Sequence, residues 1–388
     1  MRVLLSAGVW HSHVTPLLPL SLALRRAGHD VAFVTGPGGV GPVRDVGLTP
    51  VSVPPPPPDS FARFLGAVYT PAEMAALDSA ARLAVVVTAM ADIGVRTRVA
   101  EILAFSREWA PDLVIAGIGE FAGLVVASAL GVPSAVHAIG PPKSAEVMAG
   151  GWKAAAAAAA ADLGLPGPDQ AGPYLDIWPG ALRPPGVEWD FPSGWPLRPE
   201  GVLPSPGPTP AVLADLPHER TVYVTGGTSH NTRPGLLESL IAAAAGEPVN
   251  VVVTIGSDGD LSRFADQPPN VRVAHFVPQH LLLPHVSAVL CHAGAATTLG
   301  ALAHGVPLVL TPIATDQFDI AAHATAAGAA LTPDPTPGSI AAALHRVLEE
   351  PSLSTSAERL ATEIRAMPTP DEVAARLGRV ARPAQEPR

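Results

Sequence analysis

Residues 291–319 constrain the fold of this chain more than any other segment. His292 follows an apolar strand pattern, and a run of small residues then leads into a helical pattern that ends at Gly305. A second apolar strand pattern comes next, and Asp316 and Gln317 follow it. A strand, a helix and a strand in this order predict a βαβ unit, from which parallel sheets are built.

The same segment also has the chemistry of a binding site. Small residues at 293–298 allow a ligand to approach the backbone closely. The first turn of the following helix offers N–H donors and a partial positive charge, which suit a phosphate. The Asp316-Gln317 pair falls at the carboxyl end of a strand, where parallel sheets bind ligands. The alternative is an Ala/Gly-rich helix start with a histidine in the core.

The remainder of the chain alternates short apolar strands with helical patterns. In the first half, strands are predicted at 3–5, 31–34, 113–115 and 134–136, and helices at 16–26, 95–109 and 121–130. In the second half, strands are predicted at 222–225, 249–255, 271–275, 288–290 and 308–310, and helices at 235–245, 299–304, 339–348, 356–367 and 370–380. This alternation predicts an α/β fold with two Rossmann-like, doubly wound parallel-sheet domains that face a central cleft.

Proline-rich stretches mark the organisation of the chain. The segment 204–217 lacks a regular apolar pattern and is predicted to be a linker. We therefore expect an N-terminal domain over 1–203, a C-terminal domain over 218–369 and a terminal helix within 370–388. Proline-rich insertions at 54–90 and 141–199 interrupt the alternation, and the alanine run 154–161 within the second is read as a helix or a low-complexity surface segment. Insertions of this length in compact domains are usually functional.

The bulk properties exclude several classes of protein. A chain of 388 residues is long enough for two domains. A net charge of −10 without a basic run argues against nucleic acid as a partner. One cysteine, Cys291, excludes an internal disulfide and a thiolate zinc cluster, and its apolar setting favours a buried thiol over a nucleophile. The N-terminus lacks the apolar core of a secretory signal and no segment is predicted to span a membrane, so we expect a cytoplasmic protein.

A glycine motif at 36–41, Gly-Pro-Gly-Gly-Val-Gly, fits the dinucleotide-binding pattern and follows a predicted strand. A functional motif of this kind opens a helix and has an acidic residue ~20 positions later. Here Pro42 and Gly47 disfavour a long helix, and the acidic position falls near Asp59, after five consecutive prolines. A nicotinamide site is therefore not expected.

The 291–319 segment resembles the C-terminal signature of nucleotide-sugar-dependent glycosyltransferases of the B fold. It is most similar to the actinobacterial branch that modifies polyketides and related natural products. That signature is His-Gly-Gly-Ala-Gly-Thr followed by Asp-Gln, and the matching residues are His292, Gly294, Ala295, Thr297, Asp316 and Gln317. Ala293 and Ala296 replace glycines, which restricts the backbone and is expected to narrow the phosphate pocket.

His13 lies in a segment that resembles the family's Gly-His-x-x-Pro-Leu motif, between the first strand and the first helix. In that family the histidine deprotonates the acceptor, and an imidazole with an ordinary pKa of ~6.5 is neutral enough to do so. The alternatives are that His13 only caps the next helix, or that His11 is the base. Glu120 lies in a Glu-Phe-Ala-Gly sequence that is common in the bacterial branch. Its expected role is to orient His13 or a substrate hydroxyl. The alternative is that it only begins its helix with a favourable charge.

The resemblance also implies a donor site built from four segments. Gly227 and Thr228 belong to a loop that meets the diphosphate, and Val277 and Gln279 to a segment that reads the nucleobase. The expected donor-binding residues are Gly227, Thr228, Val277, Gln279, His292, Gly294, Ala295, Ala296, Thr297, Asp316 and Gln317. His292 and the helix start bear the charge of the leaving diphosphate, and Asp316 and Gln317 hold sugar hydroxyls.

The activity implied is that of an inverting glycosyltransferase. It would move a sugar, expected to be a deoxysugar, from dTDP or UDP to an apolar natural-product acceptor, forming an O- or C-glycoside. The insertions would supply the acceptor pocket, and the helix at 370–380 would cross back onto the N-terminal domain. No cofactor or metal is expected, because the only Asp-x-Asp spacing of the kind that holds a metal on a diphosphate, Asp258-Gly259-Asp260, falls in a predicted surface turn. The expected partners are the aglycone and the nucleotide sugar, and a homodimer is compatible with the sequence.

Two rival functions share this fold. A nucleotide-sugar epimerase would need acidic and basic residues facing the sugar from the N-terminal half, and it gives no reason for large acceptor insertions. A catalytically inactive helper protein that binds a partner enzyme is the second rival. A helper protein of this kind would not need the full set of predicted site residues, and this chain has all four of them: His13, His292, Asp316 and Gln317.

Overall fold

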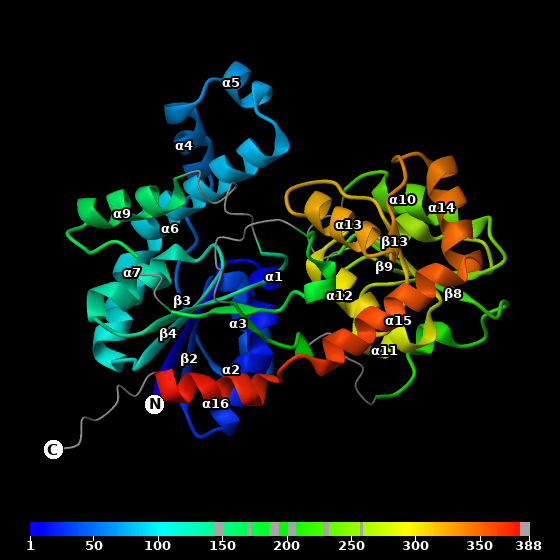
Figure 1. Cartoon of the computed structure of the whole chain (residues 1–388). Coiled ribbons are helices and arrows are strands. Elements are labelled where there is room, and N and C mark those ends of the chain that lie inside the picture. Colours follow the sequence, from blue (N-terminus) through cyan, green and yellow to red (C-terminus); the bar gives the residue numbers. More distant parts are fainter. Residues whose placement is uncertain are drawn as a thin grey trace. The chain divides into compact units, whose positions relative to one another are not determined.

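The computed structural model describes residues 1–142, 151–168, 172–185, 194–200, 207–227, 233–256 and 259–380. The chain divides into two compact units (Figure 1). Unit 1 contains Met1–Ile177, Gly186–Leu197 and Pro368–Arg388, and unit 2 contains Trp178–Pro185 and Arg198–Met367. The segment Trp178–Pro185 is attached to unit 2 by contacts that include the Ala181 N–H, which donates to Glu363 Oε1 at 3.0 Å.

Unit 1 is built on a parallel sheet of seven strands in the order β3-β2-β1-β4-β5-β6-β7. The strands are β1 (Arg2–Ser6), β2 (Asp30–Thr35), β3 (Thr49–Ser52), β4 (Leu113–Gly117), β5 (Ser134–His137), β6 (Tyr174–Asp176) and β7 (Gly194–Pro196). Because β1 pairs with both β2 and β4, the winding of the chain reverses between β1 and β4. The loops after these two strands therefore flank the switch point at which doubly wound sheets bind ligands.

Helices cover both faces of this sheet, which is why all five residues of β4 are buried. The helices are α1 (His11–Val14), η1 (Thr15–Leu17), α2 (Leu18–Arg26), α3 (Pro37–Asp45), α4 (Ser60–Val68), α5 (Pro71–Ala76), α6 (Ser79–Trp109), α7 (Phe121–Leu130), α9 (Trp152–Asp162) and α16 (Pro370–Val380). Figure 1 shows α4 and α5 projecting beyond the strands at one end of α6. The alanine run forms α9, and its buried Trp152 packs on Phe121 with ring centroids 4.6 Å apart.

Helix α6 is much longer than the predicted helix at 95–109. It begins at Ser79, where the Asp78 side chain accepts a hydrogen bond from the Ala81 N–H and so caps the helix. Val85, Ala89 and Val95 are buried along it. The apolar spacing of its first half is irregular, so burial of this segment in the tertiary structure adds the turns that the sequence pattern did not indicate.

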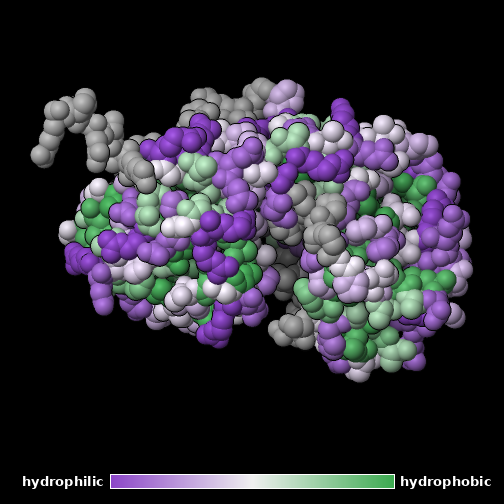
Figure 2. Space-filling view, turned by 90° about the horizontal axis from the view of Figure 1, so that it is seen from below, coloured by the Kyte–Doolittle hydropathy of each residue, from purple (hydrophilic) through white to green (hydrophobic). Residues whose placement is uncertain are grey.

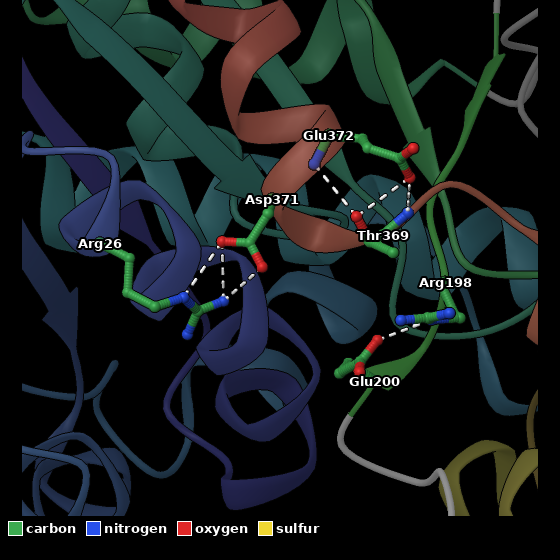
Figure 3. Close-up of polar contacts among 6 residues, drawn as sticks. All are labelled: Arg26, Arg198, Glu200, Thr369, Asp371 and Glu372. Carbon is green, nitrogen blue, oxygen red and sulfur yellow. Dashed lines mark hydrogen bonds and ion pairs between the residues drawn. The ribbon is translucent and has the colours of Figure 1, made fainter.

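Helix α16 packs against α2 in unit 1 (Figures 1 and 3). Arg26 makes a two-pronged ion pair with Asp371, at 3.1 Å from Nε to Oδ1 and 2.8 Å from Nη2 to Oδ2. Thr369 and Glu372 form a capping box at the start of the helix, with the Thr369 N–H 2.8 Å from Glu372 Oε2 and the Glu372 N–H 3.1 Å from Thr369 Oγ1.

The buried face of α16 carries Val373, Ala374 and Leu377, and the Arg376 guanidinium stacks 3.4 Å above the ring of Trp195 on β7. Because the Arg26–Asp371 pair is more than half exposed, apolar burial contributes more than that ion pair to holding α16 in place.

Unit 2 repeats the arrangement with a parallel sheet in the order β10-β9-β8-β11-β12-β13. Its strands are β8 (Thr221–Thr225), β9 (Asn250–Thr254), β10 (Val271–Ala274), β11 (Ala288–Cys291), β12 (Leu308–Leu310) and β13 (Ala330–Leu331). β8 pairs with both β9 and β11, so the loops after β8 and β11 flank the second switch point.

The helical segments of unit 2 are η2 (Gly180–Leu182), η4 (Ala211–Leu213), α10 (Leu236–Ala245), η5 (Leu261–Phe264), α11 (Gln279–Leu282), η6 (Leu283–His285), α12 (Ala295–Ala303), α13 (Gln317–Ala326), α14 (Pro337–Glu349) and α15 (Pro351–Ala366). Alternate strand residues, such as Val222 and Val224 of β8, form one core with Leu240 of α10 and Leu344 of α14. The other face of β8 carries Thr221, Tyr223 and Thr225, and it contributes polar groups to the site described below.

The predicted class of fold, with two parallel-sheet α/β domains, is confirmed. The strands β3, β6, β7 and β13 were not predicted. β3, β6 and β7 lie within or next to the proline-rich stretches, which disfavour strands, and β13 has only two residues. Figure 2 shows hydrophilic and hydrophobic residues interspersed over one face. Among the helices of the described residues, none is both long and apolar enough to cross a membrane.

Candidate functional site

His13 lies on α1, which directly follows the loop after β1. Its imidazole is partly exposed and packs over Gly8, where a Cβ atom would lie 2.9 Å from Nδ1. The ring of Trp10, which is 54% exposed, has its centroid 5.2 Å from that of His13. None of the helical segments α1, η1 and α2 has a side-chain hydrogen bond that caps its start. Helix capping is therefore not the role of the His13 side chain.

A buried ion pair holds the loop beside His13. Nη2 of Arg98, on α6, lies 3.1 Å from the carbonyl oxygen of Ala7 and 3.2 Å from Oε2 of Glu120. The two charged side chains are 2% and 4% exposed. Burial raises the pKa of Glu120, and the charge of Arg98 opposes this rise. Sequence reasoning identified Glu120 but missed Arg98, because 91 residues separate Arg98 from the carbonyl that it contacts.

The glycines of the 36–41 motif serve packing in this structure. A helix of nine residues, α3, begins in the motif, contains Pro42 and ends before Gly47, so the helix is short, as expected. A Cβ atom at Gly36 would lie 2.5 Å from Cγ1 of Val9, and one at Gly39 would lie 2.6 Å from Cγ2 of Val14. The absent side chains therefore let α3 pack closely on the segment that carries His13, which supplies the burial that offsets the proline.

In unit 2, the loops after β8 and β11 meet at His292, which is 6% exposed. A Cβ atom at Gly227 would lie 2.3 Å from Cε1 of His292, and one at Gly294 would lie 2.8 Å from Nε2. Gly227 also has a φ of +68°, which favours glycine. The backbone thus lies directly against the imidazole on two sides.

The two alanines that replace family glycines behave differently. Ala293 adopts a φ of +64°, a left-handed conformation that costs an L-residue about 1–2 kcal/mol. Ala296 lies in the first turn of α12, where alanine is favoured over glycine by about 1 kcal/mol. The restriction of the backbone is therefore a source of strain at Ala293 and a stabilising effect at Ala296.

Helix α12 presents its N-terminus at the edge of the sheet next to His292. Gly294 is its N-cap, and Ala295, Ala296 and Thr297 form its first turn. No side chain caps this helix start, and the first-turn N–H groups of a helix are not used by the helix itself. Those donors and the positive end of the helix can bind an anion.

Asp316 and Gln317 begin α13, after β12. Oδ1 of Asp316 accepts a hydrogen bond from Oγ1 of Thr315 at 3.0 Å, and Asp316 is partly exposed. Oε1 of Gln317 accepts from the N–H groups of Ile313 and Ala314 at 2.8 and 3.1 Å. Gln317 therefore orders the loop after β12.

The remaining predicted residues fall as follows. Val277 is 9% exposed in the loop between β10 and α11, beside Phe276, which is 70% exposed. Gln279 begins α11. Thr228 lies outside the described residues. Burial raises the pKa of the Cys291 thiol to about 12, which fits a structural thiol and opposes a nucleophile.

Two findings bear on metal binding. Asp260 caps η5 by accepting the Ser262 N–H at 2.9 Å, and Asp258 lies outside the described residues. Within the described ranges, no three His, Cys, Asp or Glu side chains converge in a way that could hold a metal ion. The anion-binding features above come instead from the backbone and His292.

Sequence reasoning missed a group of buried hydroxyls on the polar face of β8 and β9. Tyr223 OH lies 2.7 Å from Oγ1 of Thr254, which in turn lies 3.2 Å from Oγ1 of Thr225. Threonine and tyrosine are ordinary strand residues, so their presence in a strand pattern carries no signal of a site. Only the pairing of β8 with β9 brings these hydroxyls together.

Comparison with known proteins gives a consistent result. Residues 22–162 match the N-terminal domain, and residues 238–380 the C-terminal domain, of the family described as erythromycin biosynthesis protein CIII-like. The elloramycin glycosyltransferase ElmGT of Streptomyces olivaceus is 33% identical, over 97% of this chain and 97% of its own length. Aklavinone 7-beta-L-rhodosaminyltransferase of Streptomyces galilaeus is 30% identical, over 100% of this chain and 98% of its own length.

Among solved structures, the spinosyn rhamnosyltransferase SpnG is similar with a TM-score of 0.79 and 26% identity, over 97% of this chain and 100% of its own. It has been solved with thymidine diphosphate and with spinosyn aglycone. The two parallel sheets, the match over both halves and the relatives' activities all agree with the resemblance seen in the sequence. The chain is therefore a glycosyltransferase of the B fold and belongs to the erythromycin biosynthesis protein CIII-like family of natural-product biosynthesis.

Proposed function

We propose that this enzyme transfers a deoxysugar, with inversion, from a dTDP- or UDP-sugar to an apolar natural-product acceptor. The observation that carries the proposal is the position of His13. Its partly exposed imidazole lies at the carboxyl edge of β1, against Gly8 and beside the exposed Trp10. Relatives named as rhodosaminyl and rhamnosyl transferases, and the thymidine diphosphate bound to SpnG, support the donor class.

In the proposed reaction, His13 accepts the proton of an acceptor hydroxyl through a ring nitrogen. The acceptor oxygen forms a bond to the anomeric carbon while the bond from that carbon to the diphosphate oxygen breaks on the opposite face. The anomeric configuration is therefore inverted, and the nucleoside diphosphate leaves. An aromatic carbon as nucleophile would use the same base and give a C-glycoside.

The leaving diphosphate carries negative charge, and unit 2 offers it several donors. We assign it to His292, to the first-turn N–H groups of α12 and to the loop at Gly227. The carboxylate of Asp316 and the NH2 group of Gln317 are assigned to sugar hydroxyls. Val277 and Gln279 are assigned to the nucleobase. This assignment needs no metal ion, because backbone and imidazole donors bear the charge.

Replacing His13 with alanine tests the proposal. With dTDP- and UDP-sugars and a panel of hydroxylated polyketide aglycones, the variant is expected to lose ~10²–10⁴ in kcat, the usual contribution of a general base. Its affinity for dTDP, measured by calorimetry, should stay unchanged. His11→Ala is the matched control, because His11 is exposed and lies two residues away. NMR of the product should show an inverted anomeric centre.

Near-native turnover of His13→Ala on an unactivated hydroxyl would show that His13 is not the base. A loss of the same size in His11→Ala would mean that the base has been assigned to the wrong histidine. Epimerised sugar nucleotide in the absence of an acceptor would favour the epimerase instead.

A further inference from the structure

A continuous chain of buried and partly buried hydrogen bonds joins residues of the proposed donor site in unit 2. The Gly227 N–H donates to Oγ1 of Thr225 at 3.1 Å, and Oγ1 of Thr254 donates to the same atom at 3.2 Å. Tyr223 OH lies 2.7 Å from Oγ1 of Thr254 and accepts from Nε2 of Gln279 at 3.4 Å. Five residues on three different segments are therefore joined through hydroxyl groups.

The strand pairing explains why these groups meet. Tyr223 and Thr225 are two residues apart on β8, so both side chains are on one face, and Thr254 of β9 is the register partner of Thr225. These three residues are 1–6% exposed. Burial raises the pKa of Tyr223, so its hydroxyl keeps the proton with which it can donate to Thr254. The hydroxyls of Tyr223 and Thr254 can therefore each accept one hydrogen bond and donate the next, and Oγ1 of Thr225 accepts from both Thr254 and the Gly227 N–H.

Both ends of the hydrogen-bond chain lie at groups assigned to the nucleotide. At one end, the bond from the Gly227 N–H to Thr225 fixes the loop that lies against His292. At the other end, Nε2 of Gln279 also donates to Oγ1 of Thr297 at 3.0 Å, in the first turn of α12. Hydrogen bonds in a buried chain polarise one another, and one missing member leaves its neighbours unsatisfied at a cost.

We propose that Tyr223 and Thr254 are positioning residues that couple the nucleobase end of the donor site, at Gln279, to its diphosphate end, at Gly227. This inference rests on the proposed function of unit 2 in binding a nucleoside diphosphate. The two residues do not touch the nucleotide; they set the loops that do. When the nucleobase binds at Gln279, the hydrogen-bond chain therefore holds the Gly227 loop in the position that binds the diphosphate.

The first test measures dTDP affinity by calorimetry, with UDP as a second probe. Tyr223→Phe keeps the ring and removes only the hydroxyl, and it should weaken binding by about two- to tenfold, as expected for one or two hydrogen bonds. Thr254→Val should have a similar effect, and Thr254→Ser, which restores a hydroxyl, should return affinity to near the wild-type value.

A double-mutant cycle between the two ends separates positioning from a general loss of stability. Thr225→Val and Gln279→Leu are combined in the wild type and again in Tyr223→Phe. The effects of two substitutions on dTDP affinity are not additive when the residues share a network. In the wild-type background, we expect the affinity of the double variant to differ from the additive value by more than about twofold. In the Tyr223→Phe background, this difference should be smaller. Thr325→Val, which removes an exposed hydroxyl pair with Thr332 in the same unit, should be additive with Gln279→Leu in both.

Additivity in the wild type, or an equal deviation in Tyr223→Phe, would overturn the proposal. Hydrogen exchange of the ligand-free protein gives a second readout. Exchange of the Gly227 amide should quicken in Tyr223→Phe while amides of α14 keep their rates, and an unchanged Gly227 rate would contradict the coupling. A wild-type protein that bound neither dTDP nor UDP would refute the proposed function of the site, and exchange would still show whether the hydrogen-bond chain holds this loop.

Discussion

Replacing Gly227 with alanine should destabilise unit 2 and displace the ring of His292. A Cβ atom at this position would lie 2.3 Å from Cε1 and 2.9 Å from Nε2 of that ring, and the φ of +68° disfavours any L side chain. The ring is 6% exposed and is bounded on another side by Gly294, so it cannot move away without a shift of backbone. Both the backbone and the packing therefore oppose alanine here.

The expected magnitude has two parts. The left-handed backbone costs alanine about 1–2 kcal/mol, and an overlap forced into a packed region adds about 1–3 kcal/mol. The free energy of unfolding should thus fall by about 2–5 kcal/mol. At roughly 2–4 °C per kcal/mol for a domain of this size, the Tm of unit 2 should fall by about 4–20 °C. Urea unfolding and calorimetry measure both quantities, and titration with dTDP reports the loss of binding.

Gly235→Ala is the matched control, because Gly235 has a φ of +78° and a Cβ atom added there would meet no other atom within 4 Å. It should lose only the backbone part, about 1–2 kcal/mol. His292→Ala should relieve the overlap, so Gly227→Ala should cost less in that background. If Gly227→Ala and Gly235→Ala are equally destabilising, or if His292→Ala leaves the cost unchanged, contact with His292 is not the reason for the glycine.

Three further predictions concern the sugar, the pH and the metal. Asp316→Ala should weaken sugar-nucleotide binding by about ten- to a hundredfold, because a hydrogen bond to a charged group contributes ~1.5–3 kcal/mol. The affinity for dTDP should stay nearly unchanged. An equal loss of affinity for both ligands would mean that Asp316 has a structural role. Burial lowers the pKa of His137 to about 4 in the folded protein, whereas the ordinary value of ~6.5 applies in the unfolded chain. As the pH falls below ~6.5, His137 is therefore protonated in the unfolded chain but not in the folded protein, which favours unfolding. This histidine should therefore cost about 3 kcal/mol of stability between pH 7 and pH 4, and His137→Asn should flatten the dependence of unfolding free energy on pH, measured with urea; an unaltered slope would contradict this. Chelator should leave transfer activity intact, and loss of activity that magnesium restores would require a different donor site.

Local patterns in the sequence were sufficient for the framework of both units. The predicted helix at 121–130 is α7 (Phe121–Leu130), because Gly131 ends it with a left-handed cap and its residues are almost wholly apolar. The predicted strands at 222–225 and 288–290 are β8 and β11, and the order of strands and helices led to the two parallel sheets. The placement of His13 and His292 just beyond the ends of central strands also followed from that order, since carboxyl ends of parallel strands share one edge.

Side-chain partners required the tertiary structure. The contacts of Arg98 with Ala7 and of Tyr223 with Thr254 join residues 91 and 31 positions apart, and no local periodicity relates such pairs. The same holds for the glycines at 36 and 39, whose role depends on how closely α3 approaches Val9 and Val14. Sequence periodicity reports which face of an element is apolar, so it indicated the central strands of both sheets and most of the helices beside them. The neighbours that each polar side chain meets are set only when those elements pack, and the structure alone decided them.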